Sequence, residues 1–319
     1  MIYEYALDPE MVASWHDRKK YAFFAGRFGM DDGRVVSGYP KKWRQMVRKA
    51  FFDQIPGGDP NAEMRLNALL DTLCEKMVKR NNSFPDLPSW LEKAEYEHAV
   101  RPFRSVLSNK NPRSKPFVVT TDEVTGGTIA ESKNADHWII PPAPSPPRDA
   151  SEFAQAVAPM LRCCQHAVFV DPYFDPDPYR PRFLNTLREM LVILWSQNHG
   201  MELPQAELHI SADKKGENEI LRKCRAHLPD IIPLGGKIRV VIWKSRACGE
   251  QLHNRYLLTD IGSVGFCAGL DETDQAGHDE SDDLFRLSSH QHTKRWGQYV
   301  SAPAFEEACP PIELSAGSS

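Results

Sequence analysis

The chain has 319 residues, of which 41% are hydrophobic and 26% are charged, and its formal net charge is −4. This balance is typical of a globular protein of about two domains. No run of about 18 apolar residues occurs, so a membrane-spanning helix is not expected, and the N-terminus does not show the basic-then-apolar order of a secretory signal.

The cysteines and the distribution of charge give expectations about the cellular compartment and the binding partner. Seven cysteines at irregular spacing favour reduced thiols over a disulfide framework and predict a cytoplasmic protein. Residues 1–120 hold 20 basic and 15 acidic side chains, whereas residues 121–319 hold 19 and 28. A mildly basic front half is compatible with nucleic-acid binding and equally with a solvated helix surface.

The front of the chain predicts helices. Over residues 40–52, apolar positions recur at helical spacing and basic residues occupy the other faces. The same pattern over Asn61–Lys79 and a third helix capped by Ser89 complete a small all-helical domain, assigned to residues 1–107. Four basic positions of the first helix are candidate contacts for a nucleic-acid backbone: Lys41, Lys42, Arg44 and Lys49.

Residues 108–150 are expected to be an irregular segment that separates two domains. Two short β-like runs interrupt it, Phe117–Thr120 and Trp138–Ile140. It ends in the proline-rich residues 141–147, which have little capacity for helix or sheet and predict an extended linker.

From residue 151 to residue 308, helices and strands alternate. Strands separated by helices of this length predict an α/β fold with a mixed, mainly parallel sheet flanked by helices. A tight turn joins the last two strands, so they are expected to run antiparallel. Residues 309–319 are expected to be a disordered tail. The expected strands are residues 167–171, 207–210, 238–243, 253–260 and 264–267.

The segment from Leu252 to Asp260 is the most informative part of the sequence. Alternate side chains of a strand share a face, so His253 and Arg255 are expected to point the same way. A histidine can form a covalent bond to phosphorus, and a guanidinium can hold two phosphate oxygens. The pair therefore predicts chemistry on a phosphoryl group.

The spacing His253-x-Arg255-x4-Asp260 resembles the HxKxxxxD signature of the phospholipase D superfamily, with arginine where that family has lysine. Residues 151–308 also resemble one repeat of that fold in the order of their elements. The other segments that carry the resemblance are Asp171–Phe174, Ala268–Asp271, Asp282–Leu287 and Gln291–Tyr299.

The resemblance implies a role for each motif residue. His253 is the nucleophile, Arg255 holds the phosphate oxygens, and Asp260 fixes the structure and charge around the imidazole. No metal and no other cofactor is expected, because side chains supply the positive charge. The residues expected to line the substrate site are Asp171, Tyr173, Lys244 and Asp271.

Three departures from the family pattern bear on activity. Arginine presents a planar fork instead of a compact ammonium. Asp271 adds a negative charge where the family often has an amide, and this charge either opposes anion binding or pairs with Arg255. The family uses two histidines that face each other, and this chain has one motif, so an active site is expected to need a homodimer.

Two functions follow from the resemblance. The first is a metal-independent phosphodiesterase that acts on a nucleic-acid backbone, as a prokaryotic genome-defence or nucleic-acid-processing component. The alternative is a catalytically inactive domain of the same fold that binds nucleic acid or a partner protein. Cleavage of a phosphodiester distinguishes the two.

Overall fold

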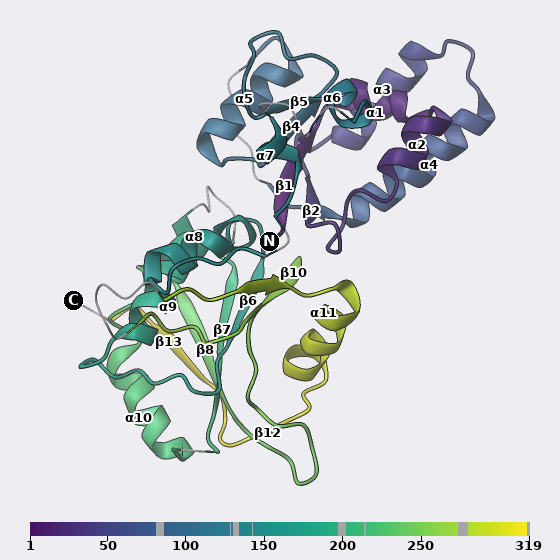
Figure 1. The fold of residues 1–319 in the computed structure, drawn as a ribbon. Helices are drawn as coiled ribbons and strands as arrows, with labels where there is room; N and C mark the ends of the chain where they lie inside the picture. The colour runs from purple at the N-terminus through teal and green to yellow at the C-terminus, as the bar shows by residue number, and fades with distance from the viewer. Residues whose placement is uncertain are drawn as a thin grey trace. The chain divides into compact units, whose positions relative to one another are not determined.

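In the computed structural model, the chain divides into two compact units, Ile2–Pro141 and Pro142–Ser319. The structure describes residues 1–80, 86–127, 129, 134–141, 143–196, 202–213, 215–273 and 280–317. Each unit contains a β-sheet covered by helices (Figure 1), so both are of the α/β class. No helix within the described ranges is long and apolar enough to cross a membrane.

The first unit is built on a five-stranded sheet in the order β3-β2-β1-β4-β5. Every pairing between these strands is parallel. The strands are β1 (Tyr3–Leu7), β2 (Arg34–Ser37), β3 (Met77–Val78), β4 (Ser105–Ser108) and β5 (Val118–Thr120).

The prediction of an all-helical front is therefore wrong. The three expected helices are present as α3 (Trp43–Gln54), α4 (Pro60–Glu75) and α5 (Trp90–Val100), but a parallel sheet lies among them. Four of the five residues of β1 and all four of β2 are buried. Strands covered by helices on both faces show no alternation of apolar and polar residues, and runs of two to five residues are too short to show a period.

Helices cover both faces of this first sheet. Tyr5 and Leu7 of β1 belong to the larger hydrophobic cluster, which also includes residues of α1 to α4. Ala6, on the opposite face, belongs to a smaller cluster with Ala94 of α5. The β-run predicted at Trp138–Ile140 is wrong: Trp138 ends a short helix, and residues 139–140 follow it without regular secondary structure. The remaining helices of the unit are α1 (Pro9–Ala13), η1 (Ser14–His16), α2 (Arg18–Phe24), α6 (Thr121–Thr125) and α7 (Ala135–Trp138).

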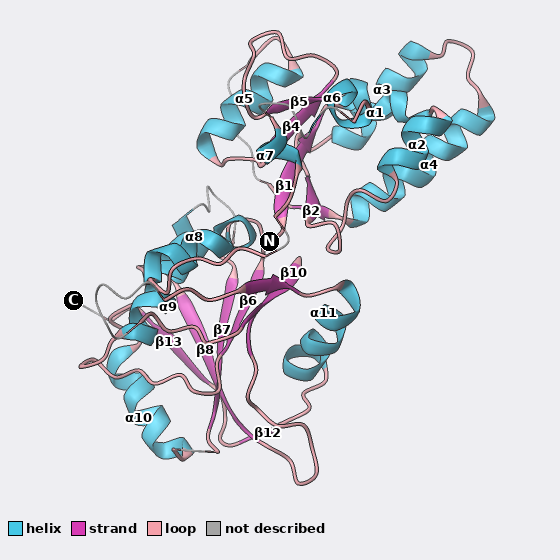
Figure 2. Cartoon of the chain, in the orientation of Figure 1, coloured by secondary structure: helices cyan, strands magenta, loops and turns pink. Residues whose placement is uncertain are grey.

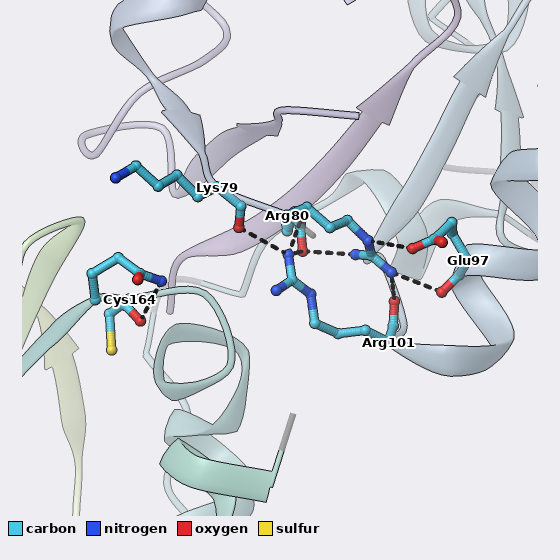
Figure 3. A network of polar contacts seen from close by, with 7 residues as sticks. Lys79, Arg80, Glu97, Arg101 and Cys164 are labelled. Carbon is cyan, nitrogen blue, oxygen red and sulfur yellow. Dashed lines mark hydrogen bonds and ion pairs between the residues drawn. The ribbon is translucent and has the colours of Figure 1, made fainter. Parts of the chain in front are cut away.

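A buried ionic network crosses the first unit. Arg80 donates to Glu4 on β1 (Nη1 to Oε2, 3.1 Å) and to Glu97 on α5 (Nε to Oε2, 3.0 Å), and it also reaches the carbonyl oxygen of Arg101 (Figure 3). Arg101 donates to Glu4 as well, at 2.9 Å. Burial alone raises the pKa of Glu4, but the two guanidinium groups outweigh it and hold that pKa below its ordinary value.

The second unit contains a mixed eight-stranded sheet in the order β11-β10-β9-β6-β7-β8-β12, with β13 also paired to β8. Strands β6, β7 and β8 are parallel, and β9 and β10 form an antiparallel hairpin, which confirms a mixed sheet and the antiparallel last pair. The pairings β6–β9, β10–β11, β8–β12 and β8–β13 are also antiparallel, so the expectation of a mainly parallel sheet is wrong for this unit. The strands are β6 (His166–Val170), β7 (Gln205–Ser211), β8 (Lys237–Lys244), β9 (Arg255–Thr259), β10 (Gly262–Phe266), β11 (Leu284–Arg286), β12 (Glu306–Glu307) and β13 (Ile312–Ser315).

Helices flank this second sheet on both sides. Figures 1 and 2 show α8 (Ala150–Leu161), α9 (Arg182–Ser196) and α10 (Glu217–His227) on one side of the strands and α11 (Ser289–Trp296) on the other. A π-helical turn, Gly297–Ser301, continues α11. Its Tyr299 packs in a hydrophobic cluster with side chains of β6, β8 and β9.

The expectation of a disordered tail is wrong for residues 312–315. These residues form β13, which pairs antiparallel with residues 237–240 of β8. Strand β8 has eight residues, and without β12 and β13 one side of it would present unpaired backbone groups. A four-residue pairing segment has too little length to predict a strand from periodicity.

The order and direction of the strands position the candidate site. Parallel strands β6, β7 and β8 end at one edge of the sheet, which is where ligands commonly bind in α/β folds. Strand β9 runs antiparallel to β6, with Val170 opposite Tyr256. Asp171, which follows β6, and Arg255, which begins β9, are therefore neighbours at this edge.

Candidate functional site

Arg255 is the central side chain of the candidate site. Its guanidinium carbon lies 4.5 Å from the centre of the Tyr173 ring, a cation–π arrangement that holds the group in place. Its Nε is buried without a hydrogen-bond partner, and its guanidinium forms no ion pair with any residue in the described ranges. The positive charge of Arg255 is thus not neutralised by a direct ion pair with a described carboxylate, while its Nε faces the protein interior.

His253 lies beside Arg255 and is exposed. It precedes β9 by two residues, so the expectation that it belongs to the strand is wrong. Its Nδ1 lies 3.2 Å from the carbonyl oxygen of Gln251. A carbonyl oxygen can only accept a hydrogen bond, so this contact places the proton on Nδ1 and leaves a lone pair on Nε2. That tautomer has a nucleophilic nitrogen.

Asp260 does not take part in this arrangement. It follows β9 at the far end, roughly 17 Å along the strand, and its Oδ1 accepts from the backbone N–H groups of Gln165 (2.9 Å) and His166 (3.2 Å). The expectation that Asp260 orients the imidazole of His253 is therefore wrong. The carbonyl of Gln251 has that position instead.

Asp171 lies beneath the site rather than at its surface. It is 1% exposed, and its two oxygens accept from the backbone N–H groups of Tyr173 (2.8 Å) and Leu270 (2.9 Å). Burial raises the pKa of Asp171 to about 6, although those hydrogen bonds and the charge of Arg255 act in the opposite direction. In this geometry the carboxyl group of Asp171 is closed to solvent, and its hydrogen bond to the N–H of Tyr173 holds the backbone of the residue that lies against Arg255.

The other two predicted substrate contacts have partners of their own. Asp271 accepts from Arg148 (Nη2 to Oδ1, 2.9 Å) and lies 3.5 Å from Nε of Arg182, so two arginines other than Arg255 compensate its charge. Lys244, at the end of β8, pairs with Glu217 at 3.4 Å. The structure thus places Tyr173 with Arg255, whereas Asp271 and Lys244 are engaged with neighbouring elements.

The four basic positions proposed in the first unit differ in their surroundings. Arg44 pairs with Asp71. Lys41 and Lys42 are exposed at the start of α3. Lys49 is exposed and lines a hollow of about 690 Å³ in this unit. Since the charge of Arg44 is compensated, the three lysines are the members of this predicted set that have no ion pair with a described residue.

A buried network on the second sheet was missed from the sequence. His166 and His209 both bond Glu207, at 2.9 and 3.1 Å. Trp243 donates to Nδ1 of His209 at 3.1 Å, so the other nitrogen of that ring carries the proton that Glu207 accepts. Glu207 and His209 are two residues apart on one strand and share a face, which was the available signal.

This network predicts a pH dependence of stability. Burial lowers the pKa of His209 below its ordinary value of 6.5, although the hydrogen bond to Glu207 acts in the opposite direction. The unfolded chain therefore binds this proton more readily than the folded chain, and stability that is present at pH 7 is lost as the pH falls below about 6.5. Hydrogen-exchange protection of the β7 amides should fall between pH 7 and pH 5.

Two substitutions test whether His209 causes this pH dependence of stability. His209→Phe should weaken the pH dependence, because the titrating group is removed. His290→Gln, at an exposed histidine of the same unit, should leave it unchanged. Equal pH slopes in the wild type and His209→Phe would contradict the assignment to His209.

No family model matches this chain, and a search of the curated proteins finds no match. Among the residues that the structure describes, no group of three or more histidine, cysteine and acidic side chains is arranged to hold a metal ion. The structure defines an α/β protein of two units, in which one edge of the second sheet carries an exposed histidine and an arginine that has no ion pair within the described part of the chain.

Proposed function

We propose that the second unit is a phosphodiesterase of the phospholipase D type that acts on a nucleic-acid backbone without a metal. The observations that support it are an exposed imidazole at His253, whose Nε2 keeps a lone pair, and, two residues later, an Arg255 guanidinium that forms no ion pair with a described residue. A nucleophile beside an anion-binding group is the minimum that attack on phosphorus requires.

The proposed reaction has two steps. Arg255 holds the non-bridging oxygens of the phosphodiester, Nε2 of His253 bonds to phosphorus, and the bond from phosphorus to the leaving oxygen breaks as an acid protonates that oxygen. Water then attacks the phosphohistidine and gives a proton to the conjugate base of that acid, the phosphorus–nitrogen bond breaks, and both His253 and the acid are regenerated. The net reaction is hydrolysis of one phosphodiester bond.

The leaving oxygen requires a proton donor. His166 and His209 are engaged with Glu207, and Asp171 is buried with both oxygens bonded to backbone. A second copy of the chain would supply another His253 through a symmetric interface. We therefore propose the homodimer as the active form.

Nucleic acid is the proposed substrate class because exposed lysines and an excess of basic residues in the front half suit a sugar-phosphate backbone. A place in prokaryotic genome defence or nucleic-acid processing is proposed by analogy with the resembling family. The alternative is a binding module without turnover. Affinity measurements do not distinguish it from an enzyme, whereas a cleavage assay does. The binding module is favoured by the engagement of both strand histidines, His166 and His209.

Arg255→Ala should weaken binding of a labelled oligonucleotide about 10- to 150-fold, because charge-assisted hydrogen bonds to phosphate are lost. Arg255→Lys should show an intermediate loss, since the charge remains without the fork. Fluorescence anisotropy at several salt concentrations measures both, and the salt slope should decrease by about one in the alanine variant.

Arg239→Ala is the matched control. Arg239 is on β8 with 48% of its side chain exposed, and its replacement should change affinity little. Equal effects of the two alanine substitutions would show that Arg255 is not a specific phosphate contact.

A further inference from the structure

The loop between β6 and α9, residues 171–181, is rigidly anchored beside the candidate site. Asp175 pairs with Lys223 at 2.8 Å, and the buried Phe174 packs on Phe183 with ring centres 5.3 Å apart. Prolines restrict the backbone further, so little conformational freedom remains to be lost on binding. The loop contains Pro172, Pro176, Pro178 and Pro181.

This loop presents an aromatic ring and a cation to solvent. Tyr179 is 93% exposed, although its backbone is held by a hydrogen bond from its N–H to Asp177 (3.0 Å). Arg180 is also exposed and forms no ion pair with a described residue. They border a hollow of about 480 Å³, lined by Tyr179, Arg180, Pro181, Arg182, Glu272 and Thr273.

The hollow and the Arg255 site share one stretch of backbone. Leu270 donates to Asp171 at 2.9 Å, and the N–H of Glu272 donates to the carbonyl oxygen of Arg182 at 3.5 Å. The two residues from Leu270 to Glu272 span at most about 7 Å. The hollow is therefore adjacent to the carboxyl group that positions the Arg255 site.

We infer that the hollow binds an unpaired nucleotide, and that the substrate of the second unit is single-stranded nucleic acid. The inference rests on the proposed function for the phosphate at Arg255. An exposed ring on a rigid loop is a stacking platform for a base, and Arg180 can hold a flanking phosphate. Bases of a duplex are already stacked on each other, so they cannot use this platform.

The test compares binding of a single-stranded oligonucleotide with binding of a duplex of equal length by the full chain. The wild type should prefer the single strand. Tyr179→Ala should raise the Kd for the single strand about 5- to 150-fold and leave the Kd for the duplex unchanged. Tyr179→Phe should retain the wild-type affinity, because the stacking ring remains.

Leu234→Ala is the matched control, since Leu234 is 92% exposed in the same unit; it should change neither Kd. A wild type that prefers the duplex, or equal losses on both ligands, would overturn the inference. If Tyr179→Ala has no effect while Arg255→Ala weakens binding, the inference fails and the proposed function stands. The reverse pattern would refute the proposed function instead.

Discussion

Replacing His253 with alanine is expected to abolish phosphodiester cleavage, with a loss of at least about 10³-fold in rate. The side chain provides the bond to phosphorus in the proposed reaction, and no neighbouring nucleophile in the described part of the site replaces it. Because His253 is exposed and lies outside β9, the substitution should not alter folding. Hydrolysis of bis-p-nitrophenyl phosphate in EDTA measures the rate.

His290→Ala serves as the control, since it removes another exposed histidine and should leave the rate unchanged. A His253→Ala variant with wild-type activity would remove this residue from the mechanism. Binding that depends on Arg255 but is never accompanied by cleavage would establish the binding-module alternative. A protein that light scattering shows to be monomeric while it cleaves would contradict the two-copy site.

Arg80→Ala should reduce the free energy of unfolding of the first unit by about 3–5 kcal/mol, because it removes the cation that pairs with buried Glu97 and leaves Glu4 with Arg101 alone. The side chains of Arg80, Glu4 and Glu97 are only 1%, 2% and 5% exposed. Chemical denaturation at pH 7 measures the loss. The loss of unfolding free energy should become smaller at acidic pH. Protonation of the buried glutamates removes the negative charge that Arg80 no longer compensates in the variant.

Arg113→Ala is the comparison for this network. Arg113 pairs with Glu92 and Glu95 but has 43% of its side chain exposed, so its loss should cost at most about 1 kcal/mol. Similar losses for Arg80→Ala and Arg113→Ala would show that burial does not set the strength of these ion pairs. A loss for Arg80→Ala that does not shrink in acid would contradict the role assigned to the glutamates.

The helices of the first unit were predictable because their signals are local. Ser89 accepts from the N–H of Glu92, and the Glu92 side chain accepts in return from the backbone of Ser89, a pairing three residues apart in the sequence. Strands β1 and β2 had no such signal, since their residues are buried on both faces. Their pairing joins segments about 30 residues apart, with Tyr3 opposite Arg34, and periodicity does not report such contacts.

The candidate site was only partly predictable for a related reason. His253 and Arg255 are two residues apart, so their proximity follows from the sequence alone. The hydrogen bond that sets the tautomer of His253 comes from Gln251, outside the motif that suggested Asp260. The exposed ring of Tyr179 was not singled out, because a tyrosine among prolines carries no signal of its exposure.

The sequence by itself determined the alternation of helices and strands in the second unit and the adjacency of a histidine and an arginine, because both depend on residues close together in the chain. The tertiary structure alone decided which charged side chains near the candidate site are neutralised by an ion pair. Asp271 is paired with Arg148, 123 positions away, whereas Arg255 lies over Tyr173 and forms no ion pair with any residue that the structure describes. Those pairings depend on the order and direction of strands, which bring distant segments to one edge of the sheet.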